Sequence, residues 1–181
     1  MPILLGKFNV TSGKVIVSDP VHSKDKDEML VKVPVKNGEW SARATVAKSG
    51  AFKGRVTSLV AIHGSAKGKG KWEAIDTIDV DGGQAGIFDY DYYPETPGDY
   101  EEVDEDEPYE SAKSFYSKAS CFTVRHDFGI MDGRGAVSSS GLGDGAYIVK
   151  QKRAGKDVIG VKIDFKSDWT TFEAAKKLHL I

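Results

Sequence analysis

The residues best suited to chemistry are a group of aspartates around a glycine-rich turn. They are Asp76, Asp79, Asp81, Asp89 and Asp91. Hard cations such as Ca²⁺ take several oxygen ligands, which closely spaced carboxylates supply. Residues 79–83 resemble the start of a calcium loop, but the position of its bidentate glutamate is Tyr90. Asp79, Asp81, Asp89 and Asp91 are the metal candidates of this chain, although a tight turn flanked by solvated strand ends explains the same residues more simply.

Two further segments contain the residue types of nucleophilic catalysis. Cys121, His126 and Asp127 supply a thiol, a base and an orienting carboxylate. If residues 121–126 form a strand, however, the cysteine and the histidine point to opposite faces. Residues 138–141 are Ser-Ser-Ser-Gly, but no serine there has glycine two positions away on both sides, as the nucleophile elbow of hydrolases requires. Neither segment identifies a catalytic site.

Residues 141–145, Gly-Leu-Gly-Asp-Gly, resemble half of a phosphate-binding loop. A dinucleotide fingerprint needs a third glycine and then a helix, whereas here a strand is expected to follow. The glycines are better explained by a tight corner that requires positive φ angles, with Asp144 capping backbone amides. No cofactor is predicted.

Residues 94–110 differ from the rest of the chain, with three prolines and a dense run of acidic residues. Like charges repel and proline blocks strand pairing, so this segment is predicted to be an exposed loop. Tyrosines accompany it, a composition suited to cationic surfaces. They are Tyr90, Tyr92, Tyr93, Tyr100 and Tyr109. A protein partner that binds this loop is one hypothesis, and a solubilising role is the simpler one.

The elements that position these residues are mainly strands, because the dominant hydrophobic period is two. Residues 40–46 alternate apolar and polar, and residues 56–62 are apolar on both faces, which favours a central strand. In residues 158–165, Ile159, Val161, Ile163 and Phe165 share one face. Further strands are expected at residues 14–18, 30–35, 72–78, 85–90, 121–126, 136–140 and 146–152. Segments 146–152 and 158–165 should pair as an antiparallel hairpin.

One short helix is expected at the C-terminus. Thr170 and Glu173 have capping-box spacing, and Phe172, Ala175 and Leu178 share a face that must dock on the sheet for the helix to persist. A second possible helix lies at residues 110–119. The predicted fold is therefore all-β, mainly an antiparallel sandwich or a partly open barrel, with one short C-terminal helix.

Composition sets limits on the class of protein. A chain of 181 residues fits one domain, residues 1–181, and 40% hydrophobic content supports a core. The net charge of −2 gives no drive toward nucleic acid or an anionic membrane. No apolar run approaches the length of a membrane span or a signal peptide, and Cys121 is the only cysteine, so we expect a cytoplasmic protein.

Three segments, taken together, carry a resemblance to a known family. They are residues 11–20, which contain Ser-Gly-Lys and Ser-Asp-Pro, the Asp/Gly turn of residues 79–89, and residues 137–147 with Ser-Ser-Gly-Leu-Gly-Asp-Gly-Ala-Tyr. In this order they resemble the bacterial family catalogued as domain of unknown function 4241. The resemblance spans most of residues 4–165 and implies a compact β-rich domain with no known activity. It draws attention to one group of binding candidates: Asp19, Asp81, Asp89, Ser140, Asp144 and Tyr147.

Two functions follow as hypotheses. The first is a non-catalytic binding or interaction module, with toxin neutralisation as one such role, that contacts its partner through the acidic, tyrosine-containing loop. The second is a metal-assisted hydrolase that uses the clustered aspartates, which requires Asp79, Asp81, Asp89 or Asp91 to approach Asp132 or Asp144. Because no catalytic motif is complete, the sequence favours the first.

Overall fold

A computed structural model describes residues 2–68, 70–98 and 108–168 of the chain. Its strands form two sheets in which all paired neighbours are antiparallel. The six-stranded sheet has the order β1 (Pro2–Val10), β4 (Gly38–Val46), β5 (Val56–His63), β11 (Asp157–Asp168), β10 (Gly145–Ala154), β6 (Trp72–Val80). The five-stranded sheet has the order β3 (Val31–Pro34), β2 (Lys14–Ser18), β7 (Gln84–Asp89), β9 (Gly135–Ser139), β8 (Phe128–Met131).

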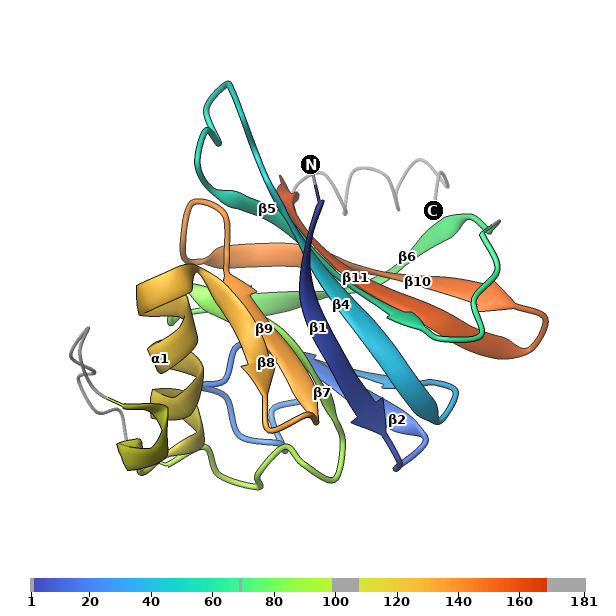
Figure 1. Cartoon of the computed structure of the whole chain (residues 1–181), viewed down its shortest axis with the longest axis horizontal. Coiled ribbons are helices and arrows are strands. Elements are labelled where there is room, and N and C mark those ends of the chain that lie inside the picture. Colours follow the sequence, from blue (N-terminus) through green and yellow to red (C-terminus); the bar gives the residue numbers. More distant parts are fainter. Residues whose placement is uncertain (1, 69, 99–107, 169–181) are drawn as a thin grey trace.

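The two sheets pack face to face around one hydrophobic core (Figure 1). Trp40 and Leu59 of the six-stranded sheet and Val15 and Ile87 of the other have no exposed surface and belong to the same cluster. Period-two alternation sends every second side chain into this layer. The predicted all-β fold is thus confirmed, and it is a sandwich of two sheets, not a closed barrel.

The helix of the described chain lies in the middle of the sequence. After a short 3-10 helix, η1 (Tyr109–Ser111), α1 (Phe115–His126) packs along β8 and β9 (Figure 1). A second hydrophobic cluster lies here, on the face of the five-stranded sheet turned away from the first core, and includes Ile16, Phe88, Val137 and Ala119. The molecule therefore has three layers, sheet, sheet and helix.

This helix corrects the prediction of a strand at residues 121–126. Ser114 accepts a hydrogen bond from the amide of Ser117 at 3.0 Å and caps the first turn. Asp127, with φ of 65°, ends the last turn in the left-handed region. The alternative helix at residues 110–119 overlaps α1 but begins too early. The predicted C-terminal helix around Thr170 lies outside the described residues.

Strands β10 and β11 form the predicted antiparallel hairpin, and β5 lies inside its sheet as expected. A register shift between Lys152 and Arg153 changes which residue at the start of β11 faces the core. Beyond this bulge Val158, not Ile159, joins the core with Val161 and the following alternate residues. Two strands were not predicted, β1 and β8. In the part of the chain described by the structure, no helix has the length and apolar character needed to cross a membrane.

Candidate functional site

The turn between β6 and β7 is the point on which most of the predicted binding candidates converge. Its three successive backbone amides point at carboxylates. Asp19 accepts from the amides of Asp81 at 2.9 Å and Gly82 at 2.6 Å, and Asp144 accepts from the amide of Gly83 at 3.0 Å. Consecutive amides of this kind form an anion-binding concavity. Here the concavity is filled by two carboxylates of the chain itself.

Asp19 is fully buried directly after β2. Burial raises the pKa of its carboxyl above the ordinary value, against the opposing effect of hydrogen bonds from the amides of Val21, Gly82 and Asp81. The adjoining loop is held by Tyr93, whose hydroxyl donates to the carbonyl oxygen of His22 at 2.7 Å. These contacts give Asp19 a structural task, which is to join the end of β2 to the β6–β7 turn.

Ser140 and Tyr147 form a corner beside this turn. The Ser140 hydroxyl donates to the carbonyl of Gly143 at 2.8 Å, and the Tyr147 hydroxyl donates to the same carbonyl at 2.7 Å. The Ser140 amide donates to the carbonyl of Gly83 at 3.1 Å, which ties the corner to the β6–β7 turn. Gly143 has φ of 114°, a conformation that favours glycine. The predicted explanation of these glycines by backbone geometry agrees with this arrangement.

A cavity of about 230 Å³ adjoins the corner. Aromatic and aliphatic side chains supply most of its lining, with Asp144 and Lys166 as the charged groups. The apolar members are Phe52, Leu142, Ala146, Tyr147 and Phe165. Leu142 is 64% exposed, and Tyr147 stacks edge to face on Phe165 with ring centroids 5.2 Å apart. The cavity is smaller than the roughly 300–1,000 Å³ of a typical small-molecule pocket.

Asp89 is the binding candidate that lies elsewhere. It ends β7, whereas Asp81 precedes that strand, so the two are separated by the length of β7, roughly 20 Å at ~3.3 Å per residue. The buried Asp89 carboxylate pairs with Arg134 and accepts hydrogen bonds from the amide and hydroxyl of Ser12. Burial by itself would raise the pKa of Asp89, but the bonds from Ser12 and Arg134 outweigh it and lower the pKa below the ordinary value.

The same separation divides the metal candidates into two pairs. Asp79 and Asp81 lie before β7, and Asp89 and Asp91 lie at or beyond its end. One cation holds its ligands within about 2.6 Å, so these four carboxylates do not share one ion. Among the described residues, no group of three or more histidine, cysteine, aspartate or glutamate side chains is arranged to hold a metal.

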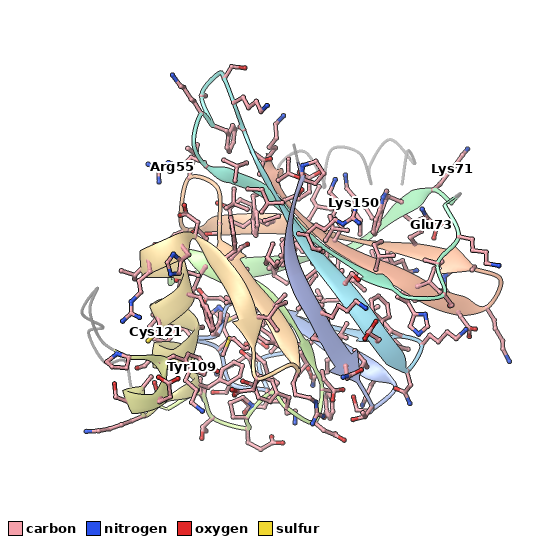
Figure 2. The ribbon with its side chains drawn as sticks, viewed as in Figure 1. Arg55, Lys71, Glu73, Tyr109, Cys121 and Lys150 are labelled. Atoms are coloured by element: carbon pink, nitrogen blue, oxygen red, sulfur yellow. The ribbon has the colours of Figure 1, made fainter. Side chains whose placement is uncertain are left out.

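Cys121 and His126 both lie on α1, not on a strand. Cys121 is buried and His126 is exposed, and a separation of five residues places them on different sides of a helix. Figure 2 shows Cys121 on the α1 side of the molecule, together with Tyr109 and away from Lys150 in the six-stranded sheet. The helical arrangement does not bring the thiol and the imidazole together.

One histidine–serine pair was missed in the sequence. Nδ1 of His63 lies 2.7 Å from the Ser65 hydroxyl and 3.0 Å from the Ser65 amide, and Nε2 lies 2.9 Å from the carbonyl oxygen of Asn37. Since an amide only donates and a carbonyl only accepts, the proton of the neutral ring is on Nε2. The imidazole thus closes the turn after β5. The His-Gly-Ser spacing was the signal that could have identified it.

The acidic segment joins the described structure beside α1. The Glu95 carbonyl accepts from the Lys24 amide at 3.1 Å, the Pro97 carbonyl accepts from the Tyr116 amide at 3.5 Å, and Tyr109 packs on Phe122 with ring centroids 5.0 Å apart. Residues 99–107 lie outside the described chain.

The neighbouring tyrosines differ in exposure. Tyr93 is 1% exposed and therefore a core residue, not a contact residue, whereas Tyr90 is partly exposed between the ammonium groups of Lys14 and Lys24, at 3.8 and 4.1 Å from its ring centroid.

Comparisons of the chain with protein-family models, curated proteins and solved structures find no significant match. The arrangement of its own residues therefore carries the functional argument.

Proposed function

We propose that this protein is a non-catalytic binding module that recognises a basic protein surface through residues 94–110. The observation that carries the proposal is the segregation of charge. Residues 94–110 contain nine acidic and no basic residues, and because the whole chain has a net charge of −2, the remaining residues carry +7. Such a local field attracts and orients a cationic partner even when the whole chain is nearly neutral.

The anchoring of the segment supports the proposal. Gly98, at its N-terminal end, packs against Ser114, the capping residue of α1, so closely that an added Cβ would lie 2.8 Å from the Ser114 Cβ. Tyr109, at its C-terminal end, packs on Phe122 of the same helix. Both ends of the acidic run are thus fixed on the α1 side, a rigid base for presenting a binding segment.

Three of the predicted site carboxylates outside the segment favour binding over hydrolysis. Asp19, Asp89 and Asp144 each use their oxygens to cap backbone amides or to pair with Arg134. A metal ligand needs a lone pair that faces the cation, and a general base needs one that faces the substrate. The hydrolase hypothesis predicts that Mg²⁺, Mn²⁺ or Ca²⁺ raises the melting temperature, and the binding-module proposal predicts no such increase.

The decisive experiment compares two variants with equal net charge. The first replaces Glu101, Glu102, Asp104, Glu105 and Asp106 by the corresponding amides. The control replaces five exposed carboxylates of the described chain, Asp25, Glu28, Glu73, Asp76 and Asp91. Each is used as bait in a quantitative pull-down, and each is titrated with a lysine-rich peptide at increasing salt.

We expect the first variant to lose its captured proteins and most of its salt-sensitive peptide affinity, while the control retains both. Capture of the same proteins by the first variant and the unchanged chain, at equal yield, would contradict the proposal. Circular dichroism of both variants establishes that the sandwich is intact.

A further inference from the structure

A polar hollow of about 470 Å³ lies on the outer face of the six-stranded sheet, the face turned away from the core. Leu59 of β5 and Ile163 of β11 point into the core, so the residues on either side of them along each strand point outward. Three neighbouring strands, β4, β5 and β11, contribute the lining. The described lining residues are Thr45, Thr57, Ser58, Lys162, Asp164 and Lys166. Hydroxyl, ammonium and carboxylate groups thus converge on one space.

A β-bulge in β5 explains the depression. The register of β4 against β5 shifts after Thr45, so that Thr57 is an extra residue on β5. The Thr57 hydroxyl donates to the carbonyl oxygen of Thr45 at 3.1 Å, which holds the bulged residue against β4. Short hydroxyl side chains therefore lie beside the long lysine side chains of β11, and the difference in length leaves a hollow.

The charge of the hollow is positive. Asp164 accepts a hydrogen bond from Nζ of Lys150 on β10 at 3.0 Å. Burial by itself would raise the pKa of Asp164, but the hydrogen bond and charge of Lys150, together with the charge of Lys162, outweigh it and lower the pKa below the ordinary value. Asp164 is thus an anion that Lys150 already neutralises. Lys162 and Lys166 form no ion pair within the described chain, so two ammonium groups of the hollow remain uncompensated.

Ser58 is a second and independent sign that the hollow takes a ligand. This residue is only 7% exposed, and its hydroxyl has no hydrogen-bond partner among the residues that the structure describes. Hydroxyls so far removed from water are normally paired, because burial of an unpaired one is unfavourable. Since Ser58 lines the hollow, an acceptor bound there would pair with it.

We propose that this hollow binds a phosphate group, either as the free anion or as part of a small hydroxylated molecule. The ammonium groups of Lys162 and Lys166 neutralise the oxyanion, and the Ser58 hydroxyl donates a hydrogen bond to it, an arrangement of charge-assisted bonds. The volume of about 470 Å³ lies within the roughly 300–1,000 Å³ of small-molecule pockets, so an organic part also has room. The site is separate from the acidic segment, which joins the molecule beside α1.

The test titrates the full-length protein with inorganic phosphate, with glycerol phosphate and with glycerol, all at one constant ionic strength. Two-dimensional amide NMR spectra follow each titration. We expect both phosphate compounds, but not glycerol, to shift the resonances of Thr45, Ser58, Lys162 and Lys166. Tighter binding of glycerol phosphate would identify an organic phosphate as the ligand, and equal affinities would identify the phosphate group alone as the recognised element.

Three variants connect the binding to these side chains. Lys162→Gln combined with Lys166→Gln should weaken phosphate binding about tenfold or more, because it removes both uncompensated charges. Ser58→Ala should weaken binding by about threefold or more without loss of stability, because this hydroxyl has no partner in the described chain. The control combines Lys26→Gln with Lys156→Gln, two exposed lysines outside the hollow, and should bind as the unchanged protein does.

The amide spectrum of each variant establishes that the sandwich persists. Resonance shifts centred on another surface, an equal loss of affinity in the control, or an unchanged affinity after Ser58→Ala would each overturn the proposal. Binding of an oligonucleotide without binding of either phosphate compound would overturn it as well.

Discussion

At the scale of single residues, the buried carboxylates of this protein fasten loops to strands. Asp19 joins the end of β2 to the β6–β7 turn by accepting from the amides of Asp81 and Gly82, and it also accepts from the amide of Val21 in its own loop. Asp89 joins the end of β7 to the β1–β2 and β8–β9 turns through Ser12 and Arg134. An unpaired buried acceptor or charge costs more than a satisfied one gains, so these pairs constrain the loops strongly.

Asp89 gives a prediction about pH. Its pKa in the folded protein is lowered, so it stabilises the fold fully above its ordinary value of 3.8, and this contribution is lost as the pH falls through the lower folded value. We expect Asp89→Asn to lower the free energy of unfolding by about 1–3 kcal/mol at pH 7.

The difference from the unchanged protein should shrink below about pH 4. Urea denaturation at a series of pH values measures it. A difference that stays constant down to pH 2 would show that the Asp89 charge does not contribute.

At the scale of elements, local sequence and tertiary contacts compete at residues 115–126. The pattern of residues 121–126, in which Cys121, Thr123 and Arg125 alternate with their neighbours, is compatible with a strand. The spacing of Phe115, Ala119 and Phe122 instead follows the period of a helix, and this helix packs on β8 and β9. The Ser114 cap and the open face of the five-stranded sheet favour the helix.

The capping contact leads to a second prediction. Ser114→Ala removes the acceptor for the Ser117 amide and should cost about 1 kcal/mol of stability. Ser114→Asp keeps an acceptor and adds a favourable charge at the helix N-terminus, so it should retain most of the stability. Thermal denaturation of both variants makes the comparison. Equal melting temperatures for the two would show that the side-chain acceptor is unimportant.

At the scale of the whole molecule, β1 links the two sheets. It is the edge strand of the six-stranded sheet, pairs with β4, and also contacts β8 and β9 of the other sheet. Phe8 is 1% exposed within the main core, whereas Leu4 of the same strand is 62% exposed. The core of the sandwich therefore includes β1, although the short apolar run of this segment did not lead to its prediction as a strand.

A third prediction uses these two residues as a matched pair. Phe8→Ala should lower the free energy of unfolding by about 3–5 kcal/mol, because it leaves a cavity between the sheets. Leu4→Ala should change it by less than about 0.5 kcal/mol. Chemical denaturation followed by tryptophan fluorescence, with Trp40 fully buried in the same core, measures both. Equal losses at the two positions would place β1 outside the cooperative core.

The sequence by itself determined an all-β antiparallel fold, a sandwich or a partly open barrel, because the period of two, the β10–β11 hairpin and the glycine turns are local properties. The order of the strands in two separate sheets, which only the tertiary structure shows, decided for the sandwich. It also indicated the turn and corner residues 81–83 and 140–147. The tertiary structure decided which of these residues meet. Only the sheet order brings Asp19 and Asp144 to one turn and places Asp89 at the far end of β7.

Contacts between distant segments likewise decided that residues 121–126 are helical and that β1 and β8 are strands. They also decided that the His63 ring, which contacts the Ser65 hydroxyl, is held on its other nitrogen by the carbonyl oxygen of Asn37. The physical reason is that burial and hydrogen-bond satisfaction depend on neighbours far away in the chain, and these override weak local preference.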